Sequence, residues 1–503
     1  MTVKALSLTI LLATTSSCKD DPPIDVPRKG DEGGGDSYCP PPCSPDGTPP
    51  GPWATLSWDI QEVHVDNPTR AAADQGRLVR ASDGTLYYAY LKFYERVSNC
   101  DIAVFGGGTA PGVNYELWAA KRDPGADTWT RELVPLDTVG PPNYVTSRYG
   151  IDSIVDNNNR LVIAVAAGGA GLASCGSTDM VLATWNGPSS WNVRAIAVGS
   201  DAFSTARPGT CQAGECLECC EAMQNACGTG TDVGAWATIA IAPNNTVGVA
   251  FTDYHNFWDE DGQNYQGLEF WEGTSTGGGT MSGIRAWSGM GLYAGLVYTS
   301  DNIPVVAFTG YKRDGLQVLR RPDTSTQCDN WKVPGTVDTP DRAIQAWERF
   351  KIGERIRMAR APDGTIGMVF HAVKDGNGTP INDLVYCFST DGGVNWGFPC
   401  KRLGLSDHVG YYPSLAYDAD SIPYVSYQFC GPASDCQSEH DGARMAWWDA
   451  AEGKWWRFII HGDTASRSGF HSGIVIDPTT KEPTVVFQHL TRGSAVVAQG
   501  RFN

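Results

Sequence analysis

One sequence pattern occurs seven times between residues 77 and 487, and it constrains the fold more than any other feature of the chain. Each copy has an apolar segment, a short polar turn and a second apolar segment that ends in an aromatic residue or Val. Such alternation around a turn of Gly, Asn or Asp is typical of a β-hairpin. The copies are RLVRASDGTLYYAY (77–90), DSIVDNNNRLVIAV (152–165), TIAIAPNNTVGVAF (238–251), GLVYTSDNIPVVAF (295–308), RMARAPDGTIGMVF (357–370), SLAYDADSIPYVSY (414–427) and GIVIDPTTKEPTVVF (473–487).

The first six copies are each followed by a second hairpin, usually with a Trp near its return. Four strands per unit of about 60 to 70 residues is the proportion of a β-propeller blade. The seventh unit has only a third strand (494–503), while the segment 54–65 before the first copy is a strand without a partner. Pairing these two would close a ring of seven blades and leave no open sheet edge. The Trp residues are Trp129, Trp191, Trp287, Trp331, Trp396 and Trp455.

Composition agrees with an all-β chain, because 58 Gly and 17 Trp residues supply many tight turns and many aromatic packing sites. Solenoids and β-sandwiches are the alternatives, since they too are built from alternating strands and turns. Closure by the segment 54–65 favours the ring. We therefore predict one seven-bladed β-propeller over residues 53–503.

The first residues predict export. A short segment with Lys4 precedes an apolar stretch too short to span a bilayer, and small residues lead to Cys18. This pattern resembles a bacterial lipoprotein signal over residues 1–17, with Cys18 as the lipidated residue. An ordinary secretory signal is the alternative. Residues 18–52 are rich in Asp, Gly and Pro and predict a tether.

The net charge disfavours polyanionic partners. The chain carries a formal net charge of −18, and removal of Lys4 with the leader makes the mature protein more negative still. Such a field repels nucleic acid and anionic lipid headgroups. We expect contact with a membrane through the lipid anchor only, and a monomeric protein.

Cysteine usage predicts disulfides, because fourteen of the 15 cysteines remain once Cys18 is set aside, and the chain is exported. Spacing suggests four pairs: Cys387 with Cys400 across one hairpin, Cys430 with Cys436, Cys39 with Cys43, and Cys100 with Cys175 between adjacent repeats. The connectivity of the remaining cysteines stays open. The cluster CQAGECLECC (211–220) favours disulfides over a thiolate metal site in an oxidising compartment.

Loop lengths predict which face carries function. The turns inside the repeat cores are minimal, whereas the connections from second to third strands are long and varied, as at 251–267, 371–383 and 428–442. Long loops on a rigid scaffold are where binding residues collect. We expect one plain face and one functional face.

The residue two positions before each repeat core is expected near the central mouth of the functional face. A ring of aromatic residues with one Arg and one His suits stacking on a sugar or holding a carboxylate. The alternative is a set of bulky residues that only fills the channel. These residues are Gln75, Gly150, Trp236, Tyr293, Arg355, Tyr412 and His471.

The segment Ser389-Thr390-Asp391-Gly392-Gly393-Val394-Asn395-Trp396 resembles the Asp-box (SxDxGxxW) of sialidase-like propellers. Looser matches occur at 123–129 and 449–455. The resemblance implies a propeller in which the Ser and Asp side chains bond to the hairpin backbone while the Trp packs into the blade.

Sialidases of this class use an Arg triad, a Tyr with a Glu partner and an Asp acid. The Arg-Ile-Pro signature of the first Arg is missing here, since the nearest segment is Arg355-Ile356-Arg357. Arg148 and Arg355 remain candidates for holding an acid.

Some polysaccharide lyases are also seven-bladed propellers that remove a proton beside a uronate carboxylate. The residue types for that chemistry are His471 or Tyr412 as base, Arg355 as carboxylate partner, and His255 and Tyr411 nearby. Ordinary packing histidines are the alternative for His255 and His471.

No cofactor is predicted. Asp259, Glu260 and Asp261 favour a solvated acidic loop, with Ca²⁺ binding as the alternative. Two functions remain: a surface-anchored lipoprotein that binds a glycan or protein ligand, with Trp236, Tyr293, Arg148 and Tyr411 as ligand-binding residues, or a secreted carbohydrate-active enzyme. The first requires no catalytic set. The second requires the catalytic candidates to converge on one pocket.

Overall fold

The computed structural model describes the greater part of residues 49–503, and the statements below concern that part of the chain. The described ranges are 49–65, 72–104, 108–136, 151–168, 178–198, 232–258, 264–284, 290–310, 316–321, 351–352, 356–374, 380–396, 400–403, 409–429, 442–462 and 467–503.

The described residues form antiparallel β-sheets with two short 3-10 helices, η1 (Gly51–Thr55) and η6 (Leu490–Arg492). Blade 1 is β2 (Ala72–Arg80), β3 (Leu86–Val104), β4 (Gly108–Arg122) and β5 (Thr130–Leu133). Blade 2 is β6 (Ile151–Val155), β7 (Leu161–Gly168), β8 (Thr178–Gly187) and β9 (Ser190–Ala197). Blade 3 is β10 (Asp232–Ile241), β11 (Val247–Trp258), β12 (Asn264–Gly273) and β13 (Gly279–Ile284).

The remaining blades follow in chain order. Blade 4 is β14 (Met290–Tyr298), β15 (Pro304–Gly310) and β16 (Leu316–Arg320). Blade 5 is β17 (Lys351–Ile352) with β18 (Arg357–Arg360), β19 (Ile366–Lys374), β20 (Pro380–Ser389) and β21 (Lys401–Arg402). Blade 6 is β22 (Val409–Tyr417), β23 (Pro423–Phe429), β24 (Gly442–Asp449) and β25 (Lys454–His461). Blade 7 is β26 (Ser468–Ile476), β27 (Pro483–His489) and β28 (Ser494–Phe502), completed by β1 (Leu56–Val65).

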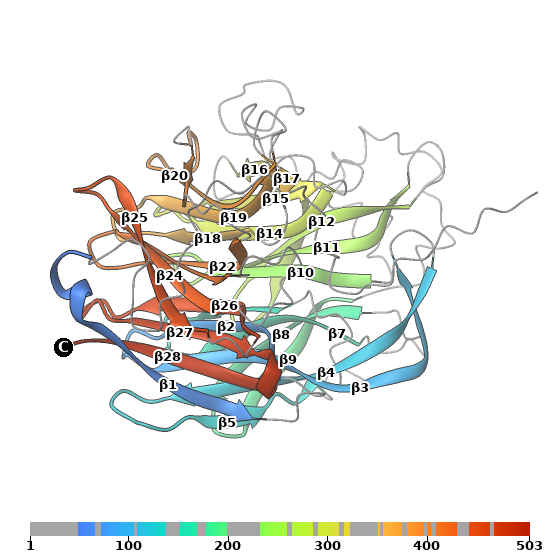
Figure 1. The fold of residues 1–503 in the computed structure, drawn as a ribbon. Helices are drawn as coiled ribbons and strands as arrows, with labels where there is room; N and C mark the ends of the chain where they lie inside the picture. The colour runs from blue at the N-terminus through green and yellow to red at the C-terminus, as the bar shows by residue number, and fades with distance from the viewer. Residues whose placement is uncertain are drawn as a thin grey trace, which may run out of the picture.

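The blades close into a ring, which confirms the predicted seven-bladed propeller (Figure 1). The first strand of every blade contacts the first strands of both neighbouring blades, in the order β2, β6, β10, β14, β18, β22, β26 and back to β2. These first strands therefore surround the axis. Within the blades, apolar residues alternate and pack between adjacent sheets, as Leu161, Ile163 and Val165 do against blade 1.

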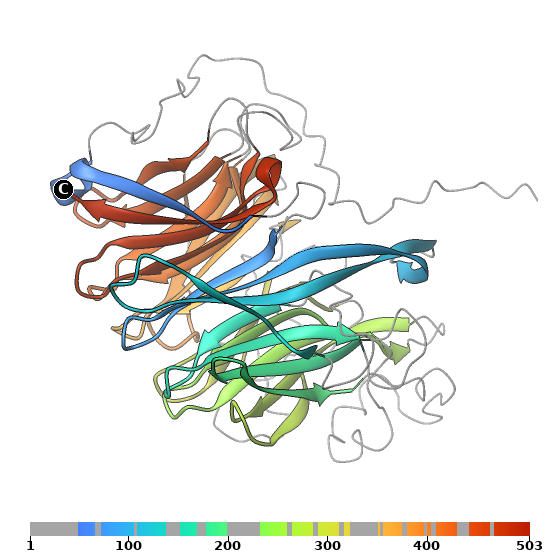
Figure 2. The ribbon, with the colours of Figure 1, turned by 90° about the horizontal axis from the view of Figure 1, so that it is seen from below.

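The first strand of the body closes the ring, as its sequence predicts. β1 pairs antiparallel with β28 from Leu56↔Phe502 to Val65↔Ser494, and Figure 2 shows this blue strand lying along the red one. Trp53, just before β1, is buried against Tyr424, Trp447 and Phe458 of blade 6 and Phe502 of blade 7. The first and last strands of the body thus complete blade 7 together, and Trp53 packs this blade against blade 6.

The two faces of the ring differ as expected. On one face, which we call the short-turn face, each blade has a tight turn. In blades 1 to 6 the same backbone bond closes it, for example Ala81 N–H to the Thr85 carbonyl and Ala361 N–H to the Thr365 carbonyl, and the turn of blade 7 is one residue longer. On the other, the long-loop face, several second and third strands extend far beyond the blade. The segment 251–267 is mostly such an extended hairpin of β11 and β12, so its interpretation as a loop is wrong over most of its length.

Candidate functional site

The inner strands share a distortion at their long-loop ends. In each of blades 1, 3, 4, 6 and 7 the inner strand carries one extra residue relative to its neighbour, as between Ala235↔Thr252 and Thr238↔Ala250. A residue in the left-handed conformation opens each bulge. These residues are Gln75 (φ 57), Trp236 (φ 50), Tyr293 (φ 56), Tyr412 (φ 52) and His471 (φ 52). They are the described members of the ring that the repeat predicts.

A left-handed conformation is costly for side chains of this kind, by about 1–2 kcal/mol per residue. A second extra residue precedes each bulge, and in blades 3, 6 and 7 it is a glycine with positive φ: Gly234, Gly410 and Gly469. A Cβ on Gly469 would lie 2.5 Å from the Gly442 carbonyl oxygen, so only glycine fits there. Bulges of this type re-aim the side chains that follow them.

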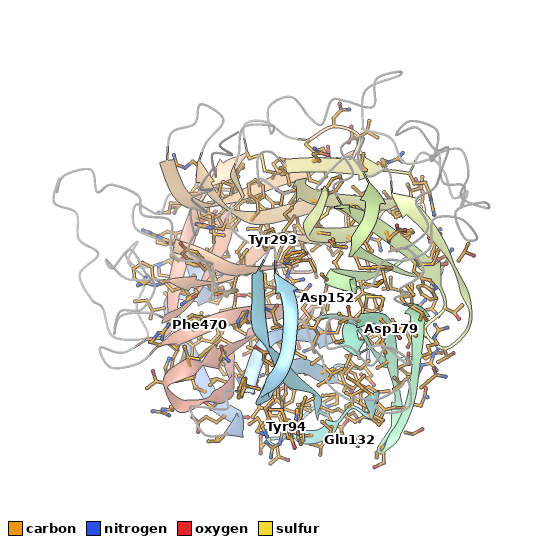
Figure 3. All side chains as sticks on the ribbon, turned by 90° about the vertical axis from the view of Figure 1, so that its right-hand side faces the viewer. Tyr94, Glu132, Asp152, Asp179, Tyr293 and Phe470 are labelled. Carbon is orange, nitrogen blue, oxygen red and sulfur yellow. A yellow bond between two sulfur atoms is a disulfide. The ribbon has the colours of Figure 1, made fainter. Side chains whose placement is uncertain are left out.

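The bulge residues of adjacent blades contact each other in pairs. The rings of Trp236 and Tyr293 lie 5.6 Å apart between centroids, and those of Tyr412 and His471 lie 4.1 Å apart. Trp236 and Tyr412 are half-buried, while Tyr293 and His471 are buried. Figure 3 shows Tyr293 near the centre of the ring of blades. We call these five bulge residues the axial mouth.

Further polar and aromatic groups lie at the same level. The Tyr411 ring packs against His371 of blade 5 in a tilted arrangement, with ring centroids 4.4 Å apart. Gln428 pairs with Tyr411 across β22 and β23 and is fully buried. Within the described part of the chain, the Gln428 amide and the Gln75 Oε1 atom have no hydrogen-bond partner. Buried polar groups without partners are rare and call for an explanation.

A charged layer crosses the axis two residues further along the inner strands. Asp152 of blade 2 pairs with Arg77 of blade 1 at 3.0 Å and with Arg357 of blade 5 at 3.3 Å. Arg77 also donates to Ser414 Oγ of blade 6 at 3.0 Å, and Thr238 of blade 3 donates to Asp152 at 3.1 Å. Because these contacts join blades on opposite sides of the ring, the axis is filled beneath the mouth. Asp152 is labelled near the centre in Figure 3.

The surroundings of Asp152 in this layer favour its ionised carboxylate. Burial opposes its ionisation, but the Arg77 and Arg357 guanidiniums and the N–H groups of Ser153 and Ile239 together hold its pKa below the ordinary value. Two arginines against one aspartate leave the described layer with an excess of positive charge. The layer beneath the mouth is therefore positively charged, although the whole chain carries a strongly negative net charge.

The structure brings together only some of the predicted site residues. Tyr412 meets His471, Trp236 meets Tyr293, and Tyr411 lies in the next pair. His255 lies on the second strand of blade 3, one residue beyond the Asp232↔Tyr254 pair, and its side chain is outside the described set. Gly150, Arg148, Arg355 and Cys18 also lie outside the described residues, as do the segments 211–227 and 259–263.

The charged layer was missed by sequence reasoning, although a signal for it exists. Arg77, Asp152 and Arg357 are each the first residue of a repeat core, where the other copies have Thr, Gly or Ser. Charged residues at the start of an otherwise apolar repeat unit mark a buried ion pair. The Gly two positions before Trp236, Tyr293, Arg355, Tyr412 and His471 is a second signal, for the bulges.

One predicted disulfide is present. Cys387 and Cys400 are bonded across the second hairpin of blade 5, with Cα atoms 4.7 Å apart. In the same hairpin, Gly393 N–H donates to Ser389 Oγ at 2.9 Å and Asn395 N–H donates to Asp391 Oδ1 at 2.8 Å, while Trp396 is buried. The other proposed cysteine pairs involve residues outside the described side chains.

No group of three or more His, Cys, Asp and Glu side chains in the described part of the chain is placed to hold a metal ion. None of the helices found there has the length and apolar character that a bilayer crossing needs.

Comparison with known proteins gives structural likeness only. No family model and no curated protein sequence matches the chain. Among solved structures, a Penicillium chrysogenum α-L-arabinanase in complex with arabinobiose is 14% identical, covering 88% of this chain and 97% of its own, with a TM-score of 0.45. A Hadza microbial sialidase is 10% identical, covering 88% and 94%, with a TM-score of 0.43.

A third structure, the GH93 α-L-arabinofuranosidase of Fusarium graminearum in complex with arabinobiose, is 11% identical. It covers 88% of this chain and 97% of its own, with a TM-score of 0.43. The class of this protein, a seven-bladed β-propeller, follows from its own strand pairing.

Proposed function

We propose that this protein is an exported lipoprotein that binds a glycan at the axial mouth of its long-loop face. The observation that carries the proposal is the repeated left-handed bulge, which holds Gln75, Trp236, Tyr293, Tyr412 and His471 at one level around the axis. Glycine would adopt this backbone without strain. Bulky residues kept in a strained backbone are a reason to propose function at that position.

The chemistry of the mouth suits a sugar. Trp236 and Tyr412 are half-buried, so their exposed ring atoms would pack against the apolar side of a pyranose, and rigid aromatic side chains lose little entropy on binding. The Gln428 amide and Gln75 Oε1, which lack partners in the described chain, would gain hydrogen bonds from ligand hydroxyls or from bridging water.

The charged layer supports a preference for acidic glycans. Arg77 and Arg357 outnumber Asp152 beneath the mouth, so a carboxylate placed there experiences a favourable field with little screening. The proposal also includes Arg355 and Arg148, which the sequence gives as candidates for holding an acid and which lie outside the described residues.

A carbohydrate-active enzyme is the second candidate, and one contact favours it. The rings of Tyr412 and His471, the two candidate bases, lie 4.1 Å apart. In a lyase one of them would remove the proton beside a uronate carboxylate. The filled axis favours binding instead, because the layer of Arg77, Asp152 and Arg357 leaves a closed floor in place of an open channel.

Anchoring through Cys18 belongs to the same proposal. Residues 18–52 would then hold the propeller away from the membrane and leave the mouth accessible to polymers. A Cys18→Ala variant should fail to incorporate a radiolabelled fatty acid and should be released from the membrane fraction. Incorporation unchanged by this substitution would exclude Cys18 as the lipidated residue.

A screen of neutral, sialylated and uronate-containing glycans tests both functions, with binding and product measured on the same samples. We expect saturable binding that weakens by about 1–2 kcal/mol, or roughly five- to thirtyfold in Kd, in Trp236→Ala and Tyr412→Ala. Trp58→Ala, a matched truncation on the closing strand, should bind as the wild type does.

The same screen separates the two candidates. Product that disappears in His471→Ala would establish the enzyme and displace the binding function. Binding that is equal in wild type, Trp236→Ala and Tyr412→Ala would remove the mouth as the site.

A further inference from the structure

Two inner strands end in nearly the same sequence on the short-turn face, Arg80-Ala-Ser-Asp-Gly84 in blade 1 and Arg360-Ala-Pro-Asp-Gly364 in blade 5. Their arginines nevertheless have different surroundings. Arg80 Nη2 donates to Asp477 Oδ2 of the preceding blade at 2.5 Å. Arg360 is half-buried and has no hydrogen bond or ion pair in the described part of the chain.

The difference comes from one position in the preceding blade. Asp477 is the first residue of the short turn in blade 7, and the corresponding residue in blade 4 is Thr299. Thr299 Oγ1 accepts from the N–H groups of Asp301 and Ile303, as one carboxylate oxygen of Asp156, Asp418 and Asp477 accepts from two N–H groups in the turns of blades 2, 6 and 7. The second carboxylate oxygen, which reaches Arg80 from Asp477, has no counterpart in blade 4.

A hollow of about 580 Å³ lies beside Arg360. Ser300, Asp363 and Tyr417 supply polar groups to its lining, and Pro243 and Pro362 supply apolar walls. The residues come from blades 3, 4, 5 and 6, so the hollow spans several short turns. Its volume is in the range of sites that hold small molecules.

Beside the hollow, the short turn of blade 5 lacks a cross-link that the turns of blades 2, 3, 4 and 6 have. The left-handed residue of each short turn usually sends a side chain to the turn before it, as Asn302 accepts from Asn244 N–H and Ser421 accepts from Asp363 N–H. In blade 5 that residue is Gly364 (φ 90), and a Cβ built there would meet no atom within 4 Å. The open space at Gly364 therefore lies in the same turn as Arg360, whose guanidinium has no acidic partner in the described part of the chain.

We propose that this hollow is a second ligand site, which takes a small sugar acid such as a hexuronate. The carboxylate pairs with Arg360, as the Asp477 carboxylate pairs with Arg80, while Asp363 and Ser300 bond hydroxyls and Tyr417 flanks the ring. Charge-assisted pairs of guanidinium and carboxylate are the strongest hydrogen bonds available to such a ligand. Partial burial lowers the pKa of Arg360, so a bound anion would also stabilise the charged form of its guanidinium. The site is independent of the axial mouth.

Phenylglyoxal, which reacts with accessible unpaired guanidiniums, tests the proposal residue by residue when modified arginines are quantified by mass spectrometry. We expect Arg360 to react about tenfold faster than Arg80, the scale set by one charge-assisted hydrogen bond. Glucuronate should protect Arg360 in a saturable manner, and glucose at the same concentrations should not. Tyr412→Ala should retain this protection, which separates the hollow from the mouth.

Thr299→Asp should reproduce the Arg80 environment and slow modification of Arg360 without any ligand. Thr299→Asn, which keeps the turn bonds but adds no charge, should leave Arg360 reactive and protected by glucuronate. The proposal is overturned if Arg360 reacts as slowly as Arg80, or if glucose and glucuronate protect it equally. It is also overturned if glucuronate gives no protection.

Discussion

The two ends of the inner strands use the same backbone conformation for different purposes. At the short-turn end, the left-handed positions hold Asn159, Asn245, Asn302, Ser421, Lys481 and two glycines, residues mostly suited to positive φ. The side chains of the five that are not glycine join neighbouring turns. At the long-loop end the left-handed positions hold Trp, Tyr, His and Gln. The first end uses positive φ at low cost to connect blades, while the second keeps a costly conformation to present side chains.

The charged layer between the two ends should give the largest effect when broken. Asp152→Asn leaves Arg77 and Arg357 facing each other without their counter-ion, so the free energy of unfolding should fall by about 3–5 kcal/mol. Equilibrium urea unfolding measures this change. Asp301→Asn, an exposed aspartate in a short turn, serves as the control and should change stability by less than about 0.5 kcal/mol. Equal losses of unfolding free energy in both variants would show that the charged layer contributes no more to stability than an exposed turn residue.

Acid should weaken the same layer. The folded-state pKa of Asp152 is depressed, so its stabilisation is present above the unfolded pKa of about 3.9 and is lost as pH falls through the folded value. Wild-type stability should therefore drop more steeply than that of Asp152→Asn below about pH 4. Parallel pH profiles of the two proteins, measured by urea midpoints, would contradict this assignment.

Substitutions at Asn159 sharpen the account of the short-turn end. Its Oδ1 accepts from Ser82 N–H at 3.0 Å and from Ser82 Oγ–H at 2.7 Å. Asn159→Ala loses both bonds and adds left-handed strain, so we expect a loss of about 2 kcal/mol, whereas Asn159→Gly should lose about 1 kcal/mol. Thermal unfolding of the pair gives the difference. Equal losses would mean that strain plays no part.

Substitutions at Trp236 make the matching test at the mouth. Trp236→Gly removes the contact with Tyr293 but also relieves the left-handed strain, so stability should stay within about 1 kcal/mol of wild type. Trp236→Ala retains the strain and should be less stable than the Gly variant. If Gly is the less stable of the two, the bulge is not strained by its side chain.

Much of the fold was predictable from the sequence, because strand alternation, turn residues and the repeat all report local backbone preference. The closing pair of β1 and β28 followed from counting strands, and the Cys387–Cys400 bond from two cysteines that flank one hairpin. The bulges were not predicted, since an extra residue changes which way later side chains point without changing composition.

Less of the site was predictable. The position two before each repeat core coincides with the residue that opens each described bulge, because equivalent positions in a repeat occupy equivalent places in the blades. The Arg77, Asp152 and Arg357 layer escaped notice because three residues far apart in sequence meet only once the ring has closed. The sequence also did not show that Arg360 lacks an acidic partner. That difference depends on Thr299, which in blade 4 occupies the position that Asp477 has in blade 7.

The central claim is that the long-loop ends of the inner strands bind the ligand and the short-turn ends near blades 1 and 2 only hold the ring together. Titration of the best-binding glycan into wild type, Trp236→Gly and Asn159→Gly tests it most directly. The account predicts a Kd raised about tenfold in Trp236→Gly at nearly unchanged stability, and an unchanged Kd in the less stable Asn159→Gly. Unchanged affinity in Trp236→Gly, or an equal loss of affinity in both variants, would contradict it.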